Sequence, residues 1–138
     1  MTRVFFDANI IIDWLNGDSS EQELCEQCIE KSLQTGGQLL ISPTTLAIVF
    51  YFVSKQYKNK SVIIQMLKES TSIFEFTTED ANTVSQSFNS NFTDIEDALQ
   101  YFSAANSNAD VIITYNISDY RKTKIPAYHP NVFLSLFE

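Results

Sequence analysis

The chain has 138 residues, of which 44% are hydrophobic and 19% are charged, and its net charge is −8. This length fits one domain over residues 1–138, and the composition is globular rather than disordered. Phosphate binding over a broad surface needs positive charge, so the acidic balance argues against a protein that coats or packages nucleic acid. It still allows nucleic-acid chemistry at a metal site, where carboxylates hold the cation.

Strands and helices alternate along the predicted element order. The predicted strands are residues 3–6, 39–41, 72–77, 111–114 and 127–128. The predicted helices are residues 10–15, 20–35, 43–57 and 61–70, with three more that begin near residues 78, 93 and 131. Ser20 with Glu23 and Thr93 with Glu96 fit capping boxes, and Ser42 precedes a proline as a helix N-cap. This alternation predicts a mostly parallel sheet covered by helices on both faces.

Neither a membrane span nor an export segment is predicted. No apolar run approaches the roughly 20 residues that cross a bilayer, and Asp7 interrupts the first apolar stretch too early for a signal peptide. Cys25 and Cys28 have C-x-x-C spacing, but they lie in one predicted helix without a second pair, so we interpret them as core residues. We expect a cytoplasmic protein in a reducing compartment, without membrane contact.

Polar residues follow two of the predicted strands. Asp7 closes the first strand, and Asn116 and Asp119 follow the strand that ends at Thr114. In an open parallel sheet, ligands bind beyond the carboxyl ends of the strands, so these residues are candidates for one site. Asn116 and Asp119 are also common turn formers, and the sequence leaves both interpretations open for them.

Asp94 and Asp97 lie in the first turn of the helix predicted to begin at Thr93, three positions apart and therefore on one face. This helix leads directly into the strand ending at Thr114, so its start is expected near that strand's carboxyl end. Carboxylates gathered from distant positions repel one another unless a cation lies between them. Hard ions such as Mg²⁺ and Mn²⁺ take such oxygen ligands.

Three segments, in order and at the expected spacing, resemble the PIN domain family. They are residues 4–10 (VFFDANI), residues 94–101 (DIEDALQY) and residues 109–120 (ADVIITYNISDY). The resemblance covers essentially the whole chain. It implies a three-layer α/β/α sandwich with a Rossmann-like, mostly parallel sheet, and a metal-dependent ribonuclease. Small bacterial members of the VapC type are commonly the toxins of toxin–antitoxin pairs, and many are homodimers.

The resemblance also implies a role for each candidate residue. Asp7 and Asp97 would hold Mg²⁺ or Mn²⁺, and the ion would activate a water for in-line attack on an RNA phosphodiester. The candidate catalytic residues are Asp7, Asp94, Asp97 and Asp119. The candidate metal ligands are Asp7, Asp97 and Asn116. Asn9 and Thr114 would orient a water or a neighbouring ligand behind them.

The sequence departs from the family pattern at two positions. Ile48 stands where the family has a metal-binding Glu, and Asn116 stands at the fourth acidic position. The chain resembles the subset of PIN-like proteins without the usual helix Glu. Asp94 or Asp119 could replace the missing ligands. The loss of two charges is expected to weaken divalent affinity, so the alternative function is a catalytically degenerate PIN-fold module that binds RNA or protein.

Further expectations concern partners. Two short basic groups are candidate contacts for RNA phosphates: Lys55, Lys58, Arg121 and Lys122. An antitoxin protein and a second copy of the chain are the expected protein partners.

Two other families would require residues that this sequence lacks. A haloacid dehalogenase-type phosphatase would need an acid at Asn9 and a threonine at Ile11, and a receiver domain would need paired acids near the start. Both fit poorly.

Overall fold

The computed structural model describes residues 2–137, which form a five-stranded, wholly parallel sheet in the order β3-β2-β1-β4-β5. The strands are β1 (Arg3–Phe6), β2 (Gln38–Ile41), β3 (Glu75–Phe76), β4 (Val111–Ile113) and β5 (Ala127–Tyr128). The α-helices are α1 (Ala8–Leu15), α2 (Gln22–Gln34), α3 (Pro43–Ser54), α4 (Lys60–Ser70), α5 (Ala81–Phe88), α6 (Ile95–Asn106) and α7 (Pro130–Ser135). Short 3-10 turns lie at η1 (Thr71–Ile73) and η2 (Ile117–Tyr120).

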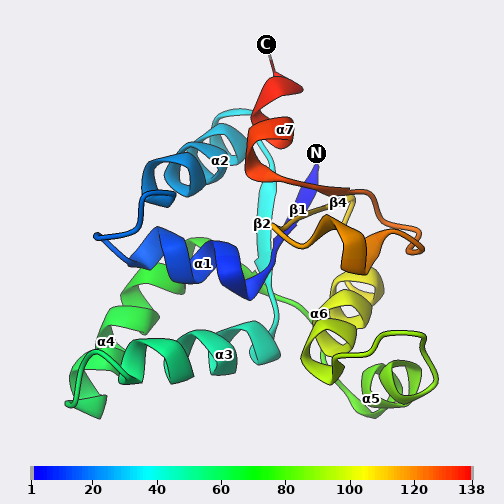
Figure 1. Cartoon of the computed structure of the whole chain (residues 1–138), viewed down its shortest axis with the longest axis horizontal. Helices are drawn as coiled ribbons and strands as arrows, with labels where there is room; N and C mark the ends of the chain where they lie inside the picture. The colour runs from blue at the N-terminus through cyan, green and yellow to red at the C-terminus, as the bar shows by residue number, and fades with distance from the viewer. Residues whose placement is uncertain (1, 138) are drawn as a thin grey trace.

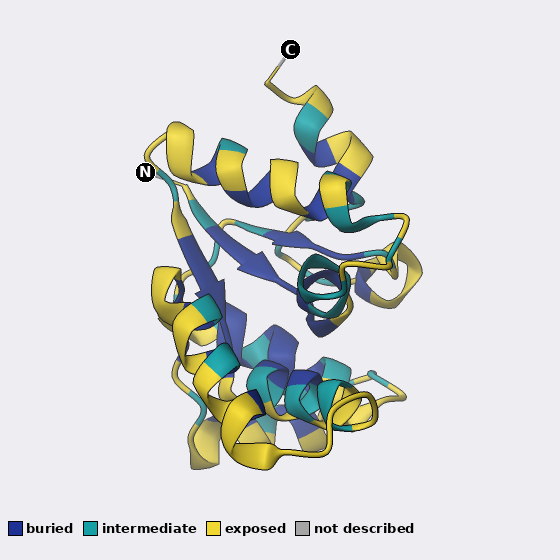
Figure 2. Ribbon diagram, turned by 90° about the vertical axis from the view of Figure 1, so that its left-hand side faces the viewer, coloured by how far each residue is buried: buried dark blue, intermediate teal, exposed yellow. Residues whose placement is uncertain are grey.

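Helices cover both faces of this sheet, because successive strand residues point to opposite sides. Val4 and Phe6 of β1 pack in a large cluster with residues of α1, α2, α3, α4 and α7. Phe5, between them, packs instead with Tyr101 and Ala104 of α6. Figure 1 shows the strands between α1 and α2 on one side and α6 on the other, and Figure 2 shows that the strands are mostly buried. The three-layer α/β/α sandwich predicted from the sequence is therefore confirmed.

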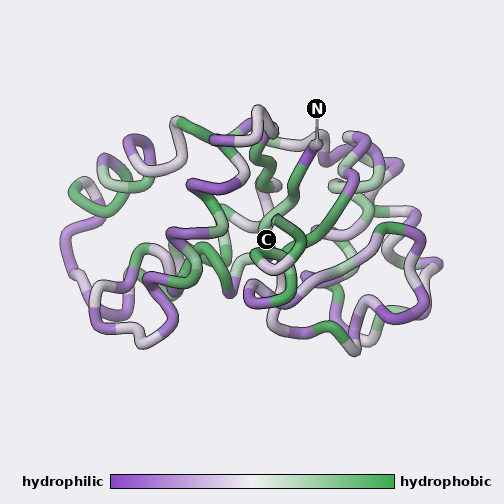
Figure 3. The backbone as a smooth tube through the Cα atoms, turned by 90° about the horizontal axis from the view of Figure 1, so that it is seen from above, coloured by the Kyte–Doolittle hydropathy of each residue, from purple (hydrophilic) through white to green (hydrophobic). Residues whose placement is uncertain are grey.

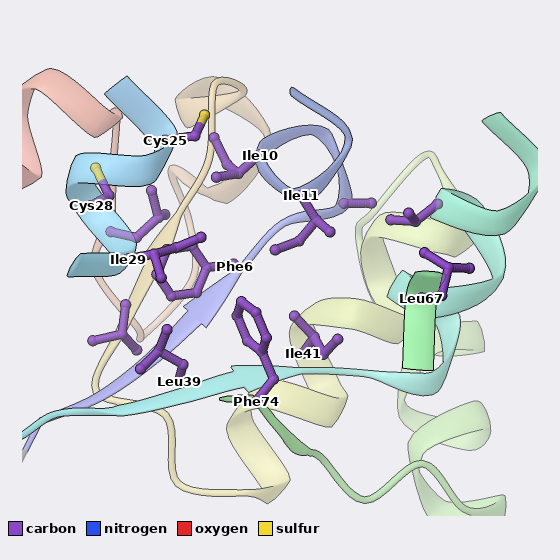
Figure 4. Close-up of a cluster of buried hydrophobic side chains, with 14 of the residues drawn as sticks. Phe6, Ile10, Ile11, Cys25, Cys28, Ile29, Leu39, Ile41, Leu67 and Phe74 are labelled. Carbon is purple, nitrogen blue, oxygen red and sulfur yellow. The ribbon is translucent and has the colours of Figure 1, made fainter. Parts of the chain in front are cut away.

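The larger of the two clusters forms the main core (Figure 4). Phe6 meets Phe74 edge to face, with ring centroids 5.7 Å apart. Cys25 and Cys28 are buried on α2 and are free thiols, as their interpretation as core residues predicts. In Figure 3 the hydrophobic residues concentrate on central segments, while the peripheral loops are mostly hydrophilic.

The strand order places the candidate site. The chain moves from β1 to β2 on one side and returns to β4 on the other, which makes the gap between β1 and β4 a topological switch point. In the register of this pair, Phe6 lies beside Ile113. The residues that follow, Asp7 and Thr114, therefore leave the sheet together at its carboxyl edge.

Some predicted element boundaries were wrong for local reasons. The predicted strand at residues 72–77 begins as η1, because the Thr71 and Ser72 hydroxyls donate to the Leu67 and Glu69 carbonyls and extend the end of α4. Only Glu75–Phe76 pairs with β2. The predicted capping box of Ser20 is absent, since α2 begins at Gln22 and its N-cap is Glu21, without a side-chain bond.

The N-cap predicted at Ser42 is confirmed. Its hydroxyl accepts from the Thr45 backbone N–H at 3.0 Å, and the Thr45 hydroxyl accepts from the Ser42 N–H. Both residues are completely buried, so the start of α3 is held rigidly beside β2. None of the helices in residues 2–137 has the length and apolarity needed to cross a membrane.

We expect Gly37→Ala to lower the free energy of unfolding by about 1–3 kcal/mol, because added volume in a tight site forces the backbone to move. A Cβ at this position would lie 2.8 Å from the Ser32 carbonyl oxygen and 3.1 Å from that of Thr2. Urea denaturation measures the loss. Gly17→Ala is the matched control, since nothing lies within 4 Å of its added Cβ. Equal stability of the two variants would contradict the packing argument.

Candidate active site

Asp7 is the most deeply buried acid of the candidate site, with 2% of its surface exposed. Its backbone N–H donates to the Ile113 carbonyl at 3.0 Å, which ties the start of α1 to β4. The Thr114 hydroxyl donates to Oδ2 at 2.7 Å, and Gln100 Nε2 lies 3.4 Å from Oδ1. Burial raises the pKa of the Asp7 carboxyl, and these bonds, with the backbone amides of Ala8 and Asn9, only partly oppose that rise.

Gln100 on α6 fixes this arrangement from the other side. Its Oε1 accepts from the Ala8 backbone N–H at 3.1 Å and from the Thr45 hydroxyl at 2.8 Å. One buried amide therefore joins the start of α1, the start of α3 and the Asp7 carboxylate. Sequence reasoning missed Gln100 and Thr45. The signal for Gln100 is its place three residues after Asp97, on the same helix face.

Gln100→Leu is expected to destabilise the protein by about 2 kcal/mol, because it leaves buried donors at Ala8 and Thr45 without their acceptor. Leucine has a similar volume, so cavity formation contributes little. Thermal or urea unfolding measures the effect. Gln65→Leu, at an exposed position of α4, is the control and should change stability by no more than about 0.5 kcal/mol. A Gln100→Leu variant as stable as the wild type would refute this positioning role.

The start of α6 brings two further acids to the site, with a different cap from the one predicted. The N-cap is Asp94 rather than Thr93, and its Oδ1 accepts from the Glu96 and Asp97 backbone N–H groups at 2.8 and 3.2 Å. Both Thr93 and Asp94 are good capping residues, and the extended backbone of Asp94 decides between them. Asp97 becomes the third residue of the helix, and the predicted pairing of Thr93 with Glu96 is lost.

Asp97 is half-buried and electrostatically strained. Its pKa is raised to about 7, first by burial and then by the negative charges of Asp7, Asp94, Asp119 and Glu96. These acids come from three separate segments of the chain, so the fold does bring the predicted acidic residues into one electrostatic environment. Their mutual repulsion is what a bound cation would relieve.

The loop after β4 supplies the remaining predicted residues. Thr114 is buried, and besides donating to Asp7 it accepts from the Asn116 backbone N–H at 3.0 Å. Asn116 is the exposed N-cap of η2, and Asp119 is exposed within this turn. Asn9 is likewise exposed, in the first turn of α1. Ile48 on α3 lies partly buried against the large apolar cluster.

The donor set fits a divalent cation that retains water ligands. Within residues 2–137, no group of three or more His, Cys, Asp or Glu side chains is gathered closely enough to hold a metal by itself. Mg²⁺ commonly binds through one or two carboxylates and keeps several waters, which suits Asp7 and Asp97. Asp119 and the amide oxygen of Asn116 are further oxygen donors on the adjoining loop.

The two basic groups lie apart. Arg121 and Lys122 directly follow Asp119. Lys55 and Lys58 lie beyond the far end of α3, whose 12 residues extend about 18 Å from its start near the site. The Lys55 ammonium lies over the Tyr51 ring, 4.4 Å from the centroid. The structure thus separates the predicted phosphate contacts into a near and a far pair.

A parallel α/β sandwich with carboxylates at its switch point is typical of proteins that bind divalent cations. The PIN domain family matches residues 3–118, and the chain belongs to that family. Ribonuclease VapC1 of Aquifex aeolicus (strain VF5) is 28% identical over 123 residues, which cover 86% of this chain and 84% of the relative.

Solved structures of similar fold include a toxin–antitoxin complex from Klebsiella pneumoniae, with a TM-score of 0.67 at 20% identity, covering 92% of this chain and 97% of that one. A chain of VapBC2 from Rickettsia felis, bound to a DNA fragment from its promoter, superposes with a TM-score of 0.71 at 20% identity, covering 93% of this chain and 98% of that one. A chain of VapBC-1 from nontypeable Haemophilus influenzae gives 0.69 at 16% identity, covering 94% and 99%. The PIN resemblance predicted from the sequence is confirmed.

Proposed function

We propose that this protein is a metal-dependent ribonuclease, in which Asp7 and Asp97 hold Mg²⁺ or Mn²⁺ and RNA phosphodiesters are hydrolysed. The observation on which the proposal rests is the position of Asp7 at the β1–β4 switch point beside α6, where Gln100, three residues after Asp97, contacts its carboxylate at 3.4 Å. Membership of the PIN family and the similarity to a relative named as a ribonuclease support it. When bound, the ion would lower the pKa of a water and stabilise charge on the phosphate oxygens.

The chain's own residues prepare this chemistry. Thr114 and Gln100 fix the orientation of the Asp7 carboxylate through the bonds described above. Asp94 holds the first turn of α6 in place through its capping bonds and adds negative charge beside Asp97. Asp119 and Asn116 supply further oxygen ligands, which compensate for the apolar Ile48. Asn9, which is exposed two positions after the buried Asp7, would orient a water.

RNA is proposed to approach along the η2 side of the site. Arg121 and Lys122 follow Asp119 there and would contact phosphates next to the cleaved bond. Lys55 and Lys58, beyond the far end of α3, would contact only distant parts of a longer RNA. The small number of basic residues predicts modest RNA affinity with weak salt dependence.

We also propose that an antitoxin protein binds the face formed by α3 and α4, and that a second copy of the chain is a further partner. An apolar groove of about 760 Å³ lies there and includes Leu46, Phe50, Ile64 and Phe76 in its walls. Tyr51 and Phe52 are exposed on α3 nearby, at 59% and 44%. Large apolar side chains on one face are typical of protein interaction sites. The similar fold of a chain in a toxin–antitoxin complex from Klebsiella pneumoniae supports an antitoxin partner.

The alternative is a catalytically degenerate PIN-fold module that binds RNA or protein. Ile48 and Asn116 favour it, because each removes a charge from the usual metal site. Such a module would keep its fold and its RNA or protein partner without hydrolysing RNA.

The test is cleavage of single-stranded RNA by purified protein with Mn²⁺ or Mg²⁺, beside a chelator and an Asp97→Asn variant. The proposed ribonuclease cleaves RNA only with the metal, and the variant does not cleave it. A contaminating nuclease would ignore the substitution. A folded wild-type protein that binds RNA but leaves it intact would establish the degenerate module instead.

A further inference from the structure

Tyr120, the last residue of η2, has a buried hydroxyl that no hydrogen bond satisfies. The residue is 3% exposed, and among residues 2–137 its hydroxyl oxygen is the buried side-chain polar atom without a partner. Buried polar groups are nearly always hydrogen-bonded, and an unpaired one is costly. Phenylalanine would fill the same space without that cost, so the hydroxyl calls for a functional explanation.

Packing fixes the ring, so the hydroxyl cannot swing away to another partner. The Tyr120 ring lies in the cluster between the sheet and α6 with Phe5 and Ile112. Its centroid is 5.9 Å from that of Phe92 and 6.2 Å from that of Tyr101. Tyr101 lies on α6 one turn beyond Asp97, which places the Tyr120 ring behind the acidic start of this helix.

The charged groups around this hydroxyl are all acceptors. Burial raises the pKa of Tyr120, and the carboxylates of Asp7, Asp97, Asp119 and Asp94 raise it further. The hydroxyl therefore stays protonated at neutral pH and can donate one hydrogen bond toward the acidic cluster.

Asp97 and Asp119 are the carboxylates in that cluster with a free place for such a donor. Of these two, Asp97 lies on α6, the helix against which the Tyr120 ring packs, whereas Asp119 is exposed on η2. Asp7 already accepts from Thr114 and Gln100, and Asp94 accepts from two backbone amides. Within the described chain, no side chain or backbone group donates to the Asp97 carboxylate. An unpaired donor and an unpaired acceptor thus belong to the same acidic cluster.

We propose that Tyr120 is a positioning residue whose hydroxyl donates to the Asp97 carboxylate when Asp97 turns to hold a divalent cation, and so fixes the orientation of that ligand. The proposal rests on the proposed metal-dependent function. Groups that hydrogen-bond a metal ligand set its direction, and their removal commonly weakens metal affinity by about 10–100-fold. In the metal-free protein the same hydroxyl is unpaired and destabilising.

Tyr120→Phe tests the proposal through two readouts that do not depend on RNA cleavage. The first is Mn²⁺ affinity by calorimetric titration, and the second is urea unfolding in the presence of chelator. Tyr101→Phe is the matched control, because it removes a hydroxyl from the same aromatic cluster, but one that accepts from the Lys124 backbone N–H at 3.1 Å.

Tyr120→Phe is expected to bind Mn²⁺ about tenfold more weakly than the wild type while unfolding at the same or a higher urea concentration. Tyr101→Phe is expected to do the reverse, with unchanged Mn²⁺ affinity and lower stability. A merely structural hydroxyl would make Tyr120→Phe less stable and leave Mn²⁺ binding unchanged, which would overturn the proposal. If the wild type itself binds no Mn²⁺, the metal-dependent function fails and this role fails with it.

Discussion

Asp7→Asn is expected to lower the rate of RNA cleavage at least about 100-fold. A metal ion contributes several kcal/mol to transition-state stabilisation, and each about 1.4 kcal/mol is a factor of ten in rate. Asparagine has nearly the same shape as aspartate, so its side-chain oxygen can still accept from Thr114. Circular dichroism should therefore report an unchanged fold, and the loss should appear only in the cleavage assay.

Asp110→Asn is the matched control for this substitution. Asp110 lies at the opposite, amino edge of the sheet, where its carboxylate accepts from the Arg3 backbone N–H at 2.7 Å. We expect Asp110→Asn to keep the wild-type cleavage rate. Equal losses in both variants would mean that general destabilisation, rather than loss of a metal ligand, explains the effect of Asp7→Asn.

Asp97→Asn is expected to stabilise the metal-free protein by about 2 kcal/mol at pH 8. The folded-state pKa of Asp97 is raised from 3.8 to about 7, a difference of about 4 kcal/mol at 1.4 kcal/mol for each pH unit. The carboxyl is partly exposed, so solvent screening reduces the expected effect to about half. Removing the charge relieves this penalty.

The pH dependence of this effect has a definite sign. Between pH 4 and pH 7 the folded state binds more protons than the unfolded state, so wild-type stability falls as pH rises through this range. Asp97→Asn should reduce this slope, and the raised pKa of Asp7 should leave a residual one. Urea midpoints at pH 5 and pH 8, both in chelator, measure the difference. If Asp97→Asn were no more stable than the wild type at pH 8, the ionised Asp97 carboxylate would not destabilise the folded state as proposed.

The sequence was most informative where a residue type and its place in the fold pointed to the same role. Asp7 ends an apolar strand, and Asp97 opens an amphipathic helix that precedes another strand, so parallel topology alone predicted that they would approach each other. Electrostatic coupling between them agrees with this prediction. The parallel sheet and its two covered faces followed from the same alternation of strands and helices.

The parts that could not be predicted depend on contacts between distant segments. In the sequence, Gln100 looks like any polar residue on a helix. Only the fold brings its side-chain amide to the Ala8 N–H and the Thr45 hydroxyl, which are distant in sequence. The choice of Asp94 over Thr93 as N-cap depends on backbone angles that composition does not encode. The structure differs from the predicted strand at the end of α4. Side-chain hydroxyls there donate to carbonyls of the helix, in a segment whose sequence alternates like a strand.

A Mn²⁺ titration of the wild-type protein and of Asp97→Asn near pH 8, where Asp97 would be ionised, addresses the proposed metal site without relying on RNA cleavage. We expect one saturable site in the wild type with a Kd of about 1 mM or tighter, and no such site in the variant. This result would mean that Asp7 and Asp97 suffice to hold the ion despite Ile48 and Asn116. Absence of binding in a folded wild type would contradict the proposed metal site and favour the degenerate binding module.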